Sequence, residues 1–528
     1  MAWNAQRSRE RIAKFNNQFV ASSVVVEDFA TQYRPRILKE AGRSGAGAET
    51  QVKDLPYGRA VLTDGVHIYA NLMDFNSNYA GQNSESEANQ KRAMQFLHLH
   101  YGASDRLVTT FEIQRVDYHS ARLHAVVLSP TDDEHERVLK AVAFANSFVE
   151  MVQRTNEMFG GRYSTQVRIG IDTGKAVAIN SGRKHEPEPL FVGSPANKAA
   201  HLAQGEEAGI FLSERVRHVL IGGSLNSDAI FKLNEQTLRS RDAEIKKLKT
   251  ASGLLLNDSV QRTIDEYVDE LRLKDTGTNP SPAVFNFHEH EPPLKTVDFE
   301  KHPPSNAIRM PMASIYADID GYTAYIDQAI ATNTIAQAVQ NLHVIRGEFS
   351  AVVRDDFGGR KIRFIGDCIH GVIAAGAAND VNSTKTVKES VKAAAAIRSS
   401  FDLCKSMLPG IHGLGLAIGV EYGTSPMCRI GLRGDASVRC AASAAIIKSE
   451  ELQTKCNGTQ TAIGEKALDA GGINVRHVFK DGICSNLDYD SAVNLIDGMS
   501  SPAVHTSSLA AATPMQAHSP LKAHTKAV

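Results

Sequence analysis

The chain reads Tyr-Ala-Asp-Ile-Asp-Gly-Tyr-Thr at residues 316–323 and Arg-Phe-Ile-Gly-Asp-Cys at residues 363–368. In each stretch a carboxylate, Asp318 or Asp367, stands at the end of an apolar run typical of a β-strand, and Gly366 permits a tight turn between paired strands. Two carboxylates on adjacent strands repel each other unless a cation lies between them, and hard oxygen ligands favour Mg²⁺ or Mn²⁺ over zinc. The pattern therefore predicts a pair of ions of the kind used in phosphoryl transfer.

The composition is that of an ordinary soluble protein, with 42% hydrophobic and 22% charged residues. A length of 528 residues predicts two to four domains. The formal net charge of −1 gives no drive toward nucleic acid or acidic membranes. Because the sequence has a polar N-terminus and lacks a run of eighteen apolar residues, we expect no signal peptide, no membrane insertion and a cytoplasmic protein.

All six cysteines lie in the C-terminal half of the chain, and none forms a Cys-x-x-Cys pair. This usage predicts neither a zinc site nor a disulfide framework, and it favours reduced thiols in the cytosol. The cysteines are Cys368, Cys404, Cys428, Cys440, Cys456 and Cys484.

The chain repeats itself. Residues 307–468 follow the same order of elements as residues 60–215, so that Asn71 aligns with Asp318 and Ala121 with Asp367. The offsets are 247 and 246 residues for these pairs, and 249 for the later glycines at 170 and 419. Because chance similarity between apolar strands does not preserve order and spacing, the pattern indicates a tandem duplication.

Within each copy the pattern is strand, long helix, β-hairpin, helix, strand and helix. In the first copy the helices are expected at about 85–99 and 132–159, where apolar residues recur at helical spacing. This order predicts an α+β fold with helices packed on a mostly antiparallel sheet.

Other segments flank the two copies. We expect a short charged helix at 4–15 that packs on the first domain, and a charge-rich helical stretch at 234–274 with a break near Ser252 and Gly253. Thus the predicted parts are an N-terminal helical segment (1–59), two domains (60–233 and 307–499), a connector ending in a Pro-rich linker (234–306), and a disordered tail (500–528).

At these residues the chain resembles the class III nucleotidyl cyclases, the family of adenylate and guanylate cyclases. Asp-Ile-Asp-Gly-Tyr-Thr at 318–323 is similar to the family's Asp-Ile-x-Gly-Phe-Thr, and Phe-Ile-Gly-Asp-Cys at 364–368 is similar to its Ile-Gly-Asp hairpin. The resemblance implies two ferredoxin-like cyclase domains that form an intramolecular pseudo-heterodimer, with each site at their interface.

The two copies are unequal at the positions that the family uses. The first copy has Asn71 and Ala121 in place of the metal carboxylates, yet its Gly-Ser-Pro-Ala-Asn-Lys-Ala-Ala-His-Leu at 193–202 resembles the family's Gly-x-x-Val-Asn-x-Ala-Ala-Arg-Leu. Asn197 stands in the Asn position and His201 replaces the Arg. Each copy lacks what the other retains, which predicts one working site and one degenerate site.

The second copy keeps both aspartates but matches the Asn-Arg motif only after a one-residue insertion. That alignment places Arg439 at the Asn position and Ser443 at the Arg position. Arg363 aligns with the base-selecting position of the degenerate site, where we expect a structural ion pair.

The resemblance assigns roles around the working site. Asp318, Asp367 and Ile319 are expected to hold two Mn²⁺ or Mg²⁺ ions, and the N–H groups of Ile319, Gly321, Tyr322 and Thr323 to cradle the phosphates at a helix start. Asn197 would orient the ribose, and His201 would supply the charge or hydrogen bond of the missing Arg. These two are the expected catalytic residues of a reaction that converts a nucleoside triphosphate to a cyclic nucleotide and pyrophosphate.

The base-selecting positions hold Asp117 and Leu190. A carboxylate only accepts hydrogen bonds, so Asp117 requires an N–H of the base, which all four bases offer. The bulky neighbours Arg115, Tyr118 and His119 are expected to fill the space of a purine's second ring.

A tandem chain of this kind resembles the bacterial uridylate and cytidylate cyclases of Pycsar anti-phage systems. This favours UTP or CTP as substrate and cyclic UMP or cyclic CMP as a messenger for a separate effector, with no nucleic-acid partner. An adenylate or guanylate cyclase is one alternative, and a catalytically inactive nucleotide-binding regulator is another. A homodimer, the trigger and the choice between uracil and cytosine stay open.

Overall fold

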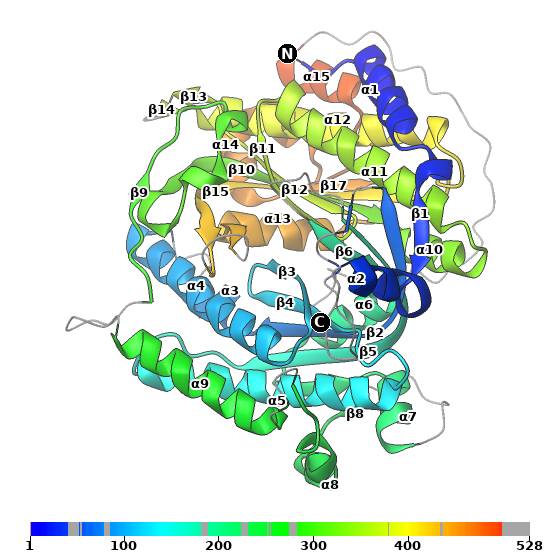
Figure 1. Ribbon diagram of the computed structural model, residues 1–528. Coiled ribbons are helices and arrows are strands. Elements are labelled where there is room, and N and C mark those ends of the chain that lie inside the picture. Colours follow the sequence, from blue (N-terminus) through cyan, green and yellow to red (C-terminus); the bar gives the residue numbers. More distant parts are fainter. Residues whose placement is uncertain are drawn as a thin grey trace.

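The computed structural model describes residues 2–40, 52, 55–56, 58–78, 85–180, 188–222, 231–250, 253, 255–273, 282–377, 380–432 and 437–498. The predicted tail at 500–528 lies outside these ranges. Figure 1 shows two halves stacked on each other, each built on one curved sheet with helices on its outer side.

The first half contains an eight-stranded sheet in the order β3-β4-β2-β5-β7-β8, with β1 paired to β2 and β6 to β5. Most neighbours are antiparallel, whereas β1–β2 and β5–β7 are parallel. The strands are β1 (Val25–Asp28), β2 (Arg59–Leu72), β3 (Gln114–His119), β4 (Arg122–Val127), β5 (Val167–Asn180), β6 (Pro189–Val192), β7 (Gly209–Leu212) and β8 (Phe231–Lys232).

The second half contains a sheet with the same order, β11-β12-β10-β15-β17-β18, in which β9 pairs with β10 and β16 with β15. A separate two-stranded ribbon joins β13 to β14. The strands are β9 (Phe287–His288), β10 (Ala307–Asp320), β11 (Arg360–Ile365), β12 (Cys368–Ile373), β13 (Gly376–Ala377), β14 (Asp380–Val381), β15 (Gly415–Ile430), β16 (Val438–Ala441), β17 (Gln460–Ile463) and β18 (Ile483–Ser485).

The strand register confirms the predicted repeat. Asn71 of β2 lies opposite Arg168 of β5, and Asp318 of β10 lies opposite Ala417 of β15, the positions related by the offsets of 247 and 249 residues. The α+β class with mostly antiparallel sheets is therefore confirmed in both halves.

Long amphipathic helices cover the outer face of each sheet. The predicted helix at 132–159 is α5, and the one at 85–99 continues to Thr110 as α4, because the apolar spacing persists through Leu107 and Val108. The helices of the first half are α3 (Phe75–Asn78), α4 (Glu87–Thr110), α5 (Glu134–Met158), α6 (Ser194–Leu202) and α7 (Glu214–Ile221). Those of the second are α10 (Tyr322–Ala331), α11 (Ile335–Ala351), α12 (Ser383–Met407), α13 (Ala444–Lys455), α14 (Glu465–Val478) and α15 (Tyr489–Asp497).

The connector contains more structure than the sequence indicated. Its helical part forms α8 (Glu235–Ile245) and α9 (Leu256–Leu273), separated at the predicted break, and α9 packs on α4 and α5. Inside the segment predicted as a Pro-rich linker, β9 pairs in parallel with the start of β10. This pairing repeats the way in which β1 adds to β2.

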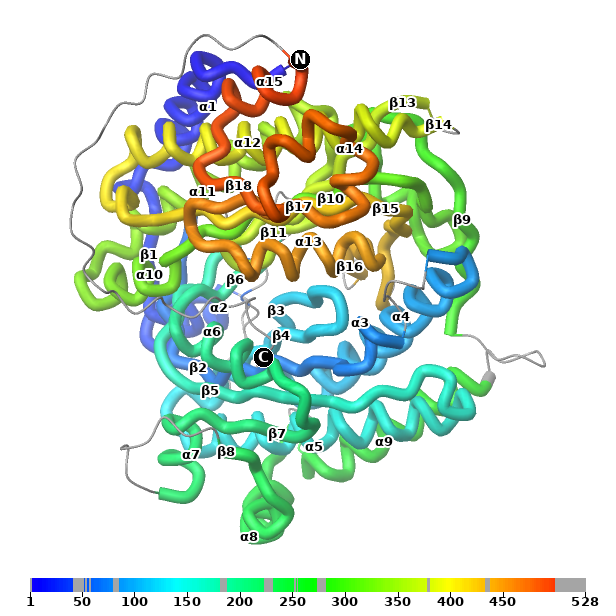
Figure 2. The backbone as a smooth tube through the Cα atoms, turned by 180° about the vertical axis from the view of Figure 1, so that it is seen from behind, coloured from blue at the N-terminus to red at the C-terminus, as the bar shows by residue number. Residues whose placement is uncertain are grey.

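The N-terminal helix was predicted to pack on the first domain, and this prediction is wrong. Helix α1 (Ala5–Gln18) packs on α11 and α12 of the second half, as Figure 2 shows from behind, whereas α2 (Arg34–Glu40) lies beside the first sheet. Arg11 donates to Glu348 at 2.9 Å and to Asp356 at 2.9 Å, and these buried acids had no visible link to Arg11 in the sequence. Since β1 joins the first sheet, the N-terminal segment spans both halves.

All six cysteines carry free thiols, five of them buried. Among the helices that the structure describes, none combines the length and the apolar character needed to cross a membrane.

Candidate active site

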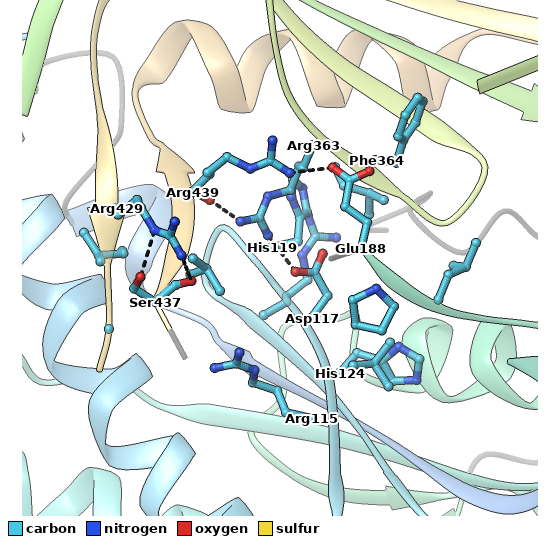
Figure 3. Close-up of a pocket in the computed structure, with 18 of the residues that line it drawn as sticks. Arg115, Asp117, His119, His124, Glu188, Arg363, Phe364, Arg429, Ser437 and Arg439 are labelled. Carbon is cyan, nitrogen blue, oxygen red and sulfur yellow. Dashed lines mark hydrogen bonds and ion pairs between the residues drawn. The ribbon is translucent and has the colours of Figure 1, made fainter. Parts of the chain in front are cut away.

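A cavity of about 1680 Å³ lies between the two halves and is lined by side chains from both. Figure 3 shows part of its wall, where side chains of β3 in the first half point toward side chains of β11 and β16 in the second. Asp117, Leu190 and Asn197 line it from the first half, and Tyr322, Thr323 and Asp367 from the second. Six of the predicted site residues are thus brought together.

The two predicted metal carboxylates belong to neighbouring elements of the second half. Asp318 lies near the end of β10 with 4% of its surface exposed, and Asp367 lies in the turn between β11 and β12, where Gly366 has a φ of +60°. Burial, followed by the charges of Asp318 and Asp367, raises the pKa of the Cys368 thiol well above its usual value, so both carboxylates lie near this sulfur. The Gln453 amide donates to Asp318 at 3.3 Å.

This donor set fits a hard divalent cation. Within the described ranges, no cluster of three or more His, Cys, Asp or Glu side chains could hold a metal by itself. Two carboxylates and a main-chain carbonyl leave coordination positions for phosphate oxygens and water, which is how Mg²⁺ is usually bound beside nucleotides.

The segment after Asp318 has the geometry of an anion-binding turn. Gly321 adopts a φ of +86°, which favours glycine, and α10 begins at Tyr322 directly afterwards. The first N–H groups of this ten-residue helix have no intrahelical partner. The buried Tyr322 hydroxyl has no hydrogen-bond partner in the described part of the chain, and burial, with Asp367 as the next cause, raises its pKa.

Helix α6 of the first half meets α10 of the second at this point. The Asn197 amide donates to the Thr323 hydroxyl, and the Ser194 N–H donates to the Asp327 carboxylate at 3.0 Å. These contacts join the two predicted half-sites directly.

His201 lies one turn further along α6 and is absent from the cavity wall as far as the structure describes it. Its Nδ1 atom is buried without a hydrogen-bond partner among the described residues. Burial, together with the charges of Lys198 and Arg168, lowers the pKa of His201, which favours the neutral imidazole. His201 follows Asn197 by four residues and so lies on the same side of α6, but its lowered pKa does not favour a positive charge there.

The predicted base-selecting residues lie on two strands that approach each other closely without pairing, Asp117 on β3 and Leu190 on β6. Arg363 of β11 donates to Asp117 at 2.9 Å (Figure 3). The ion pair expected for Arg363 is confirmed. Its partner is Asp117, the predicted base-selecting residue of the first copy.

Of the three bulky neighbours of Asp117, Arg115 and His119 line the cavity, whereas Tyr118 does not. Tyr118 is buried in the core, where its ring stacks on Tyr101 at 4.1 Å and its hydroxyl donates to Asp105. Arg115 lines the cavity but is held by Asp105 at 2.7 Å. His119 also lines it, at 3.0 Å from Glu450 of the second half.

Sequence reasoning missed a second bridge across the cavity. Glu188 accepts from Lys361 at 2.8 Å and from Arg439 at 2.5 Å, and all three side chains are largely buried. Burial raises the pKa of Glu188, but the charges of Lys361, Arg439 and Arg346 outweigh it and lower that pKa to about 2. For Lys361 the effect of burial outweighs the attraction of the Glu188 carboxylate and lowers the pKa to about 8, so the ammonium is still charged at neutral pH. The only sequence signal was the pair of cations, Lys361 and Arg363, in an apolar strand.

The packing of α13 corrects the alignment predicted for the degenerate site. A Cβ on Gly170 would meet Ala199 and Ala203, and one on Gly419 would meet Ser449 and Gln453. The offset is 250 residues in both cases. Asn197 therefore corresponds to Ile447 and His201 to Glu451. Arg439 lies instead in β16, and Ser443 caps the start of α13.

In the first half, a salt bridge lies beside Asn71 and Ala121, the residues at the metal-binding positions of the repeat. Arg122, next to the buried Ala121 and opposite Asn71, pairs with Glu450 of α13. At the other interface the corresponding residues are small: Cys368 of the second half in place of Arg122, and Ala200 of the first half in place of Glu450. The predicted degenerate site thus contains a cation and a carboxylate at positions that hold small residues in the predicted working site.

The chain is similar to two uridylate cyclases over most of its length. A uridylate cyclase of a Rhizobium species is 43% identical over 501 residues, covering 93% of this chain and 95% of the relative. A uridylate cyclase of Pseudomonas aeruginosa is 38% identical over 458 residues, covering 85% of this chain and 86% of the relative.

Among solved structures, the crystal structure of a class III adenylyl cyclase-like ATP-binding protein from Pseudomonas aeruginosa has a TM-score of 0.81. It is 33% identical and covers 94% of this chain and 100% of its own. No protein-family profile matches the chain.

Proposed function

Because this chain belongs to the family of the uridylate cyclases, within the class III nucleotide cyclases, we propose that it converts UTP to 3′,5′-cyclic UMP and pyrophosphate. The observation that carries the proposal is the contact of Asn197 with Thr323, which joins a ribose-orienting amide of one half to the phosphate-binding turn of the other. Only the half with Thr323 keeps both aspartates.

The residues present fit the metal ions that such a reaction uses. Asp318 and Asp367, with the main chain of Ile319, would hold Mg²⁺ or Mn²⁺. When bound, these ions lower the pKa of the ribose 3′-hydroxyl and neutralise the triphosphate.

The protein's own groups supply positioning and charge. The N–H groups at the start of α10, from Gly321 to Thr323, bind phosphate oxygens, favoured by the helix dipole. Asn197 holds the ribose so that its 3′-oxygen faces the α-phosphate. Arg346, which donates to the Gly366 carbonyl, lines the cavity as a cation and takes over the charge that His201, with its lowered pKa, does not provide.

The relationship to uridylate cyclases suggests the cellular role. Within this proposal, cyclic UMP is a messenger for a separate effector in anti-phage defence, made in the cytoplasm by the domains at 60–233 and 307–499. The described helices include none suited to crossing a membrane.

The test is to incubate the purified chain with UTP, CTP, ATP or GTP and Mn²⁺, and to identify products by mass spectrometry. Cyclic UMP as the main product supports the proposal. Cyclic CMP would keep the reaction but change the base. Cyclic AMP would favour a second candidate, suggested by the ATP-binding relative, and binding without any cyclic product would leave a regulatory nucleotide-binding protein.

A further inference from the structure

We propose that Arg363 and Asp117 read the base as a unit, with Asp117 accepting the N3–H of uracil and Arg363 donating to a neighbouring carbonyl. The inference rests on the proposed function. It adds a specificity-determining residue from the half that carries the metal carboxylates.

The hydrogen bonds leave one oxygen of Asp117 for a ligand. Oδ1 accepts from Arg363 Nη1 at 2.9 Å and from the Tyr118 N–H at 2.8 Å. Oδ2 has no hydrogen-bond partner in the described part of the chain, and 31% of the Asp117 side chain is exposed, toward a cavity that both residues line. The acceptor is thus fixed in place and accessible from the cavity.

Arg363 is equally fixed. Its Nη2 donates to the main-chain carbonyl of Arg439, and only 9% of its side chain is exposed. A guanidinium has five N–H groups, of which these contacts use two. A carboxylate acceptor and a guanidinium donor therefore stand side by side on the cavity wall.

This arrangement matches the edge of uracil, on which N3–H lies between two carbonyl oxygens. Cytosine presents an unprotonated N3, so the same pose would set a lone pair against the carboxylate. A polar group that loses its partner in a buried site costs about 1–3 kcal/mol, roughly 10- to 100-fold in discrimination.

The two residues occupy the same position of the two repeats, 246 residues apart, and have diverged to opposite charge. In a symmetric pair of sites, position 363 would serve only the degenerate site. The ion pair across the interface instead brings Arg363 to the selector of the working site. Glu188 and Arg439, which form a second ion pair between the halves, line the same cavity.

The test compares UTP with CTP, by kcat/KM for cyclic product and by Kd from calorimetry with Ca²⁺ and non-cyclisable analogues. Asp117→Asn provides a donor and an acceptor, and we expect it to shift the UTP-to-CTP ratio at least 10-fold toward CTP. Arg363→Lys keeps the charge but loses the planar fork, and we expect a 10- to 100-fold loss for UTP. Arg429→Lys is the matched control, because Arg429 lines the same cavity but donates to Ser437.

A double variant separates base reading from a structural ion pair. Exchanging the charges, Asp117→Arg with Arg363→Asp, keeps a salt bridge across the interface but reverses donor and acceptor. We expect thermal stability to recover relative to Asp117→Arg alone, while selectivity for UTP does not return. Recovery of both would overturn base reading and leave a structural pair.

The outcomes also separate this inference from the proposed function. If the wild-type chain makes cyclic UMP and the Asp117 and Arg363 variants keep its UTP-to-CTP ratio, base reading is wrong and the function stands. If the wild-type makes no cyclic UMP but binds UTP with a preference that these variants abolish, the function fails and base reading stands. A wild-type preference for CTP in both assays overturns both.

Discussion

At the scale of single residues, the two halves differ most at the two carboxylates. Asp318 and Asp367 lie near one thiol in the second half, whereas the first half has Asn71 and Ala121 at these positions. We predict that Asp318→Ala or Asp367→Ala lowers kcat at least 10³-fold, because each variant removes a ligand for ions that stabilise the charge of the transition state. Initial rates of cyclic UMP formation with saturating Mn²⁺ measure the effect.

Asn71→Ala is the matched control for this prediction, since it changes the same repeat position in the other half. Its rate should remain within about 2-fold of the wild-type rate. Equal losses in Asp318→Ala and Asn71→Ala would mean that the first half also takes part in metal binding, contrary to the assignment.

At the scale of elements, a glycine lets each sheet approach its central helix. A Cβ on Gly419 would meet the main chain of α13 at Ser449 and Gln453 well inside contact distance. We predict that Gly419→Ala lowers the free energy of unfolding by about 1–3 kcal/mol or more, since overpacking a close contact displaces backbone. It should also lower activity, because Gln453 donates to Asp318. Denaturant unfolding and initial rates are the two measurements.

Gly413 provides the control for this substitution. A Cβ there would meet nothing within 4 Å, and its φ lies outside the left-handed region. Gly413→Ala should therefore change the free energy of unfolding by less than about 0.5 kcal/mol. An equal effect at Gly413 and Gly419 would contradict the packing argument.

The elements also show what the sequence could predict. Strand alternation and helical spacing are local, so β10, the hairpin of β11 and β12, and α5 were predictable, and the repeat offset placed Asp318 and Asp367 in register. Partners between distant segments were not. Nothing in 4–15 indicated that α1 packs on α11, and two residues are too few for β9 to be recognised as a strand.

The same limit applies to the site. The sequence alignment paired Arg439 with Asn197, an offset of 242 residues, whereas the close approach of Gly419 to α13 gives an offset of 250 and leaves Arg439 in β16. The ion pair of Asp117 with Arg363 joins residues 246 positions apart. A single sequence gives the residue types of such a pair but not the contact.

At the scale of the whole molecule, Glu188 forms ion pairs between the two halves, and these make the stability of the protein depend on pH. Its lowered pKa, about 2, means that the ionised carboxylate stabilises the fold above the ordinary pKa of 4.5 and that this stability is lost as the pH falls toward 2. We predict that Glu188→Gln lowers stability at pH 7 by about 3–5 kcal/mol, since two buried cations lose their counter-charge. Melting temperatures between pH 7 and pH 3 check this prediction.

The acid dependence is the specific part of the prediction. Relative to the wild type, the Glu188→Gln profile should be flatter between pH 5 and pH 3, because the titrating group is gone. Glu207→Gln is a suitable control, since Glu207 pairs with Lys232 on the surface of one half. If the melting temperatures of the wild type and of Glu188→Gln change in parallel with pH, this ion pair does not govern stability in acid.

Because the two aspartates lie in the second half and Asn197 lies in the first, we predict that each chain binds one nucleotide. Calorimetry with a non-cyclisable UTP analogue and Ca²⁺ should give a stoichiometry of one. Restoring the carboxylates by Asn71→Asp with Ala121→Asp should not raise it, because Arg122 and Glu450 still meet there and Ile447 replaces the ribose-binding amide. Adding Arg122→Cys, Glu450→Ala and Ile447→Asn removes both obstacles, and a second, weaker site in this quintuple variant alone is the expected result. Two sites in the wild-type chain would show that the first half retains a nucleotide site and that the assignment of a single working interface is wrong.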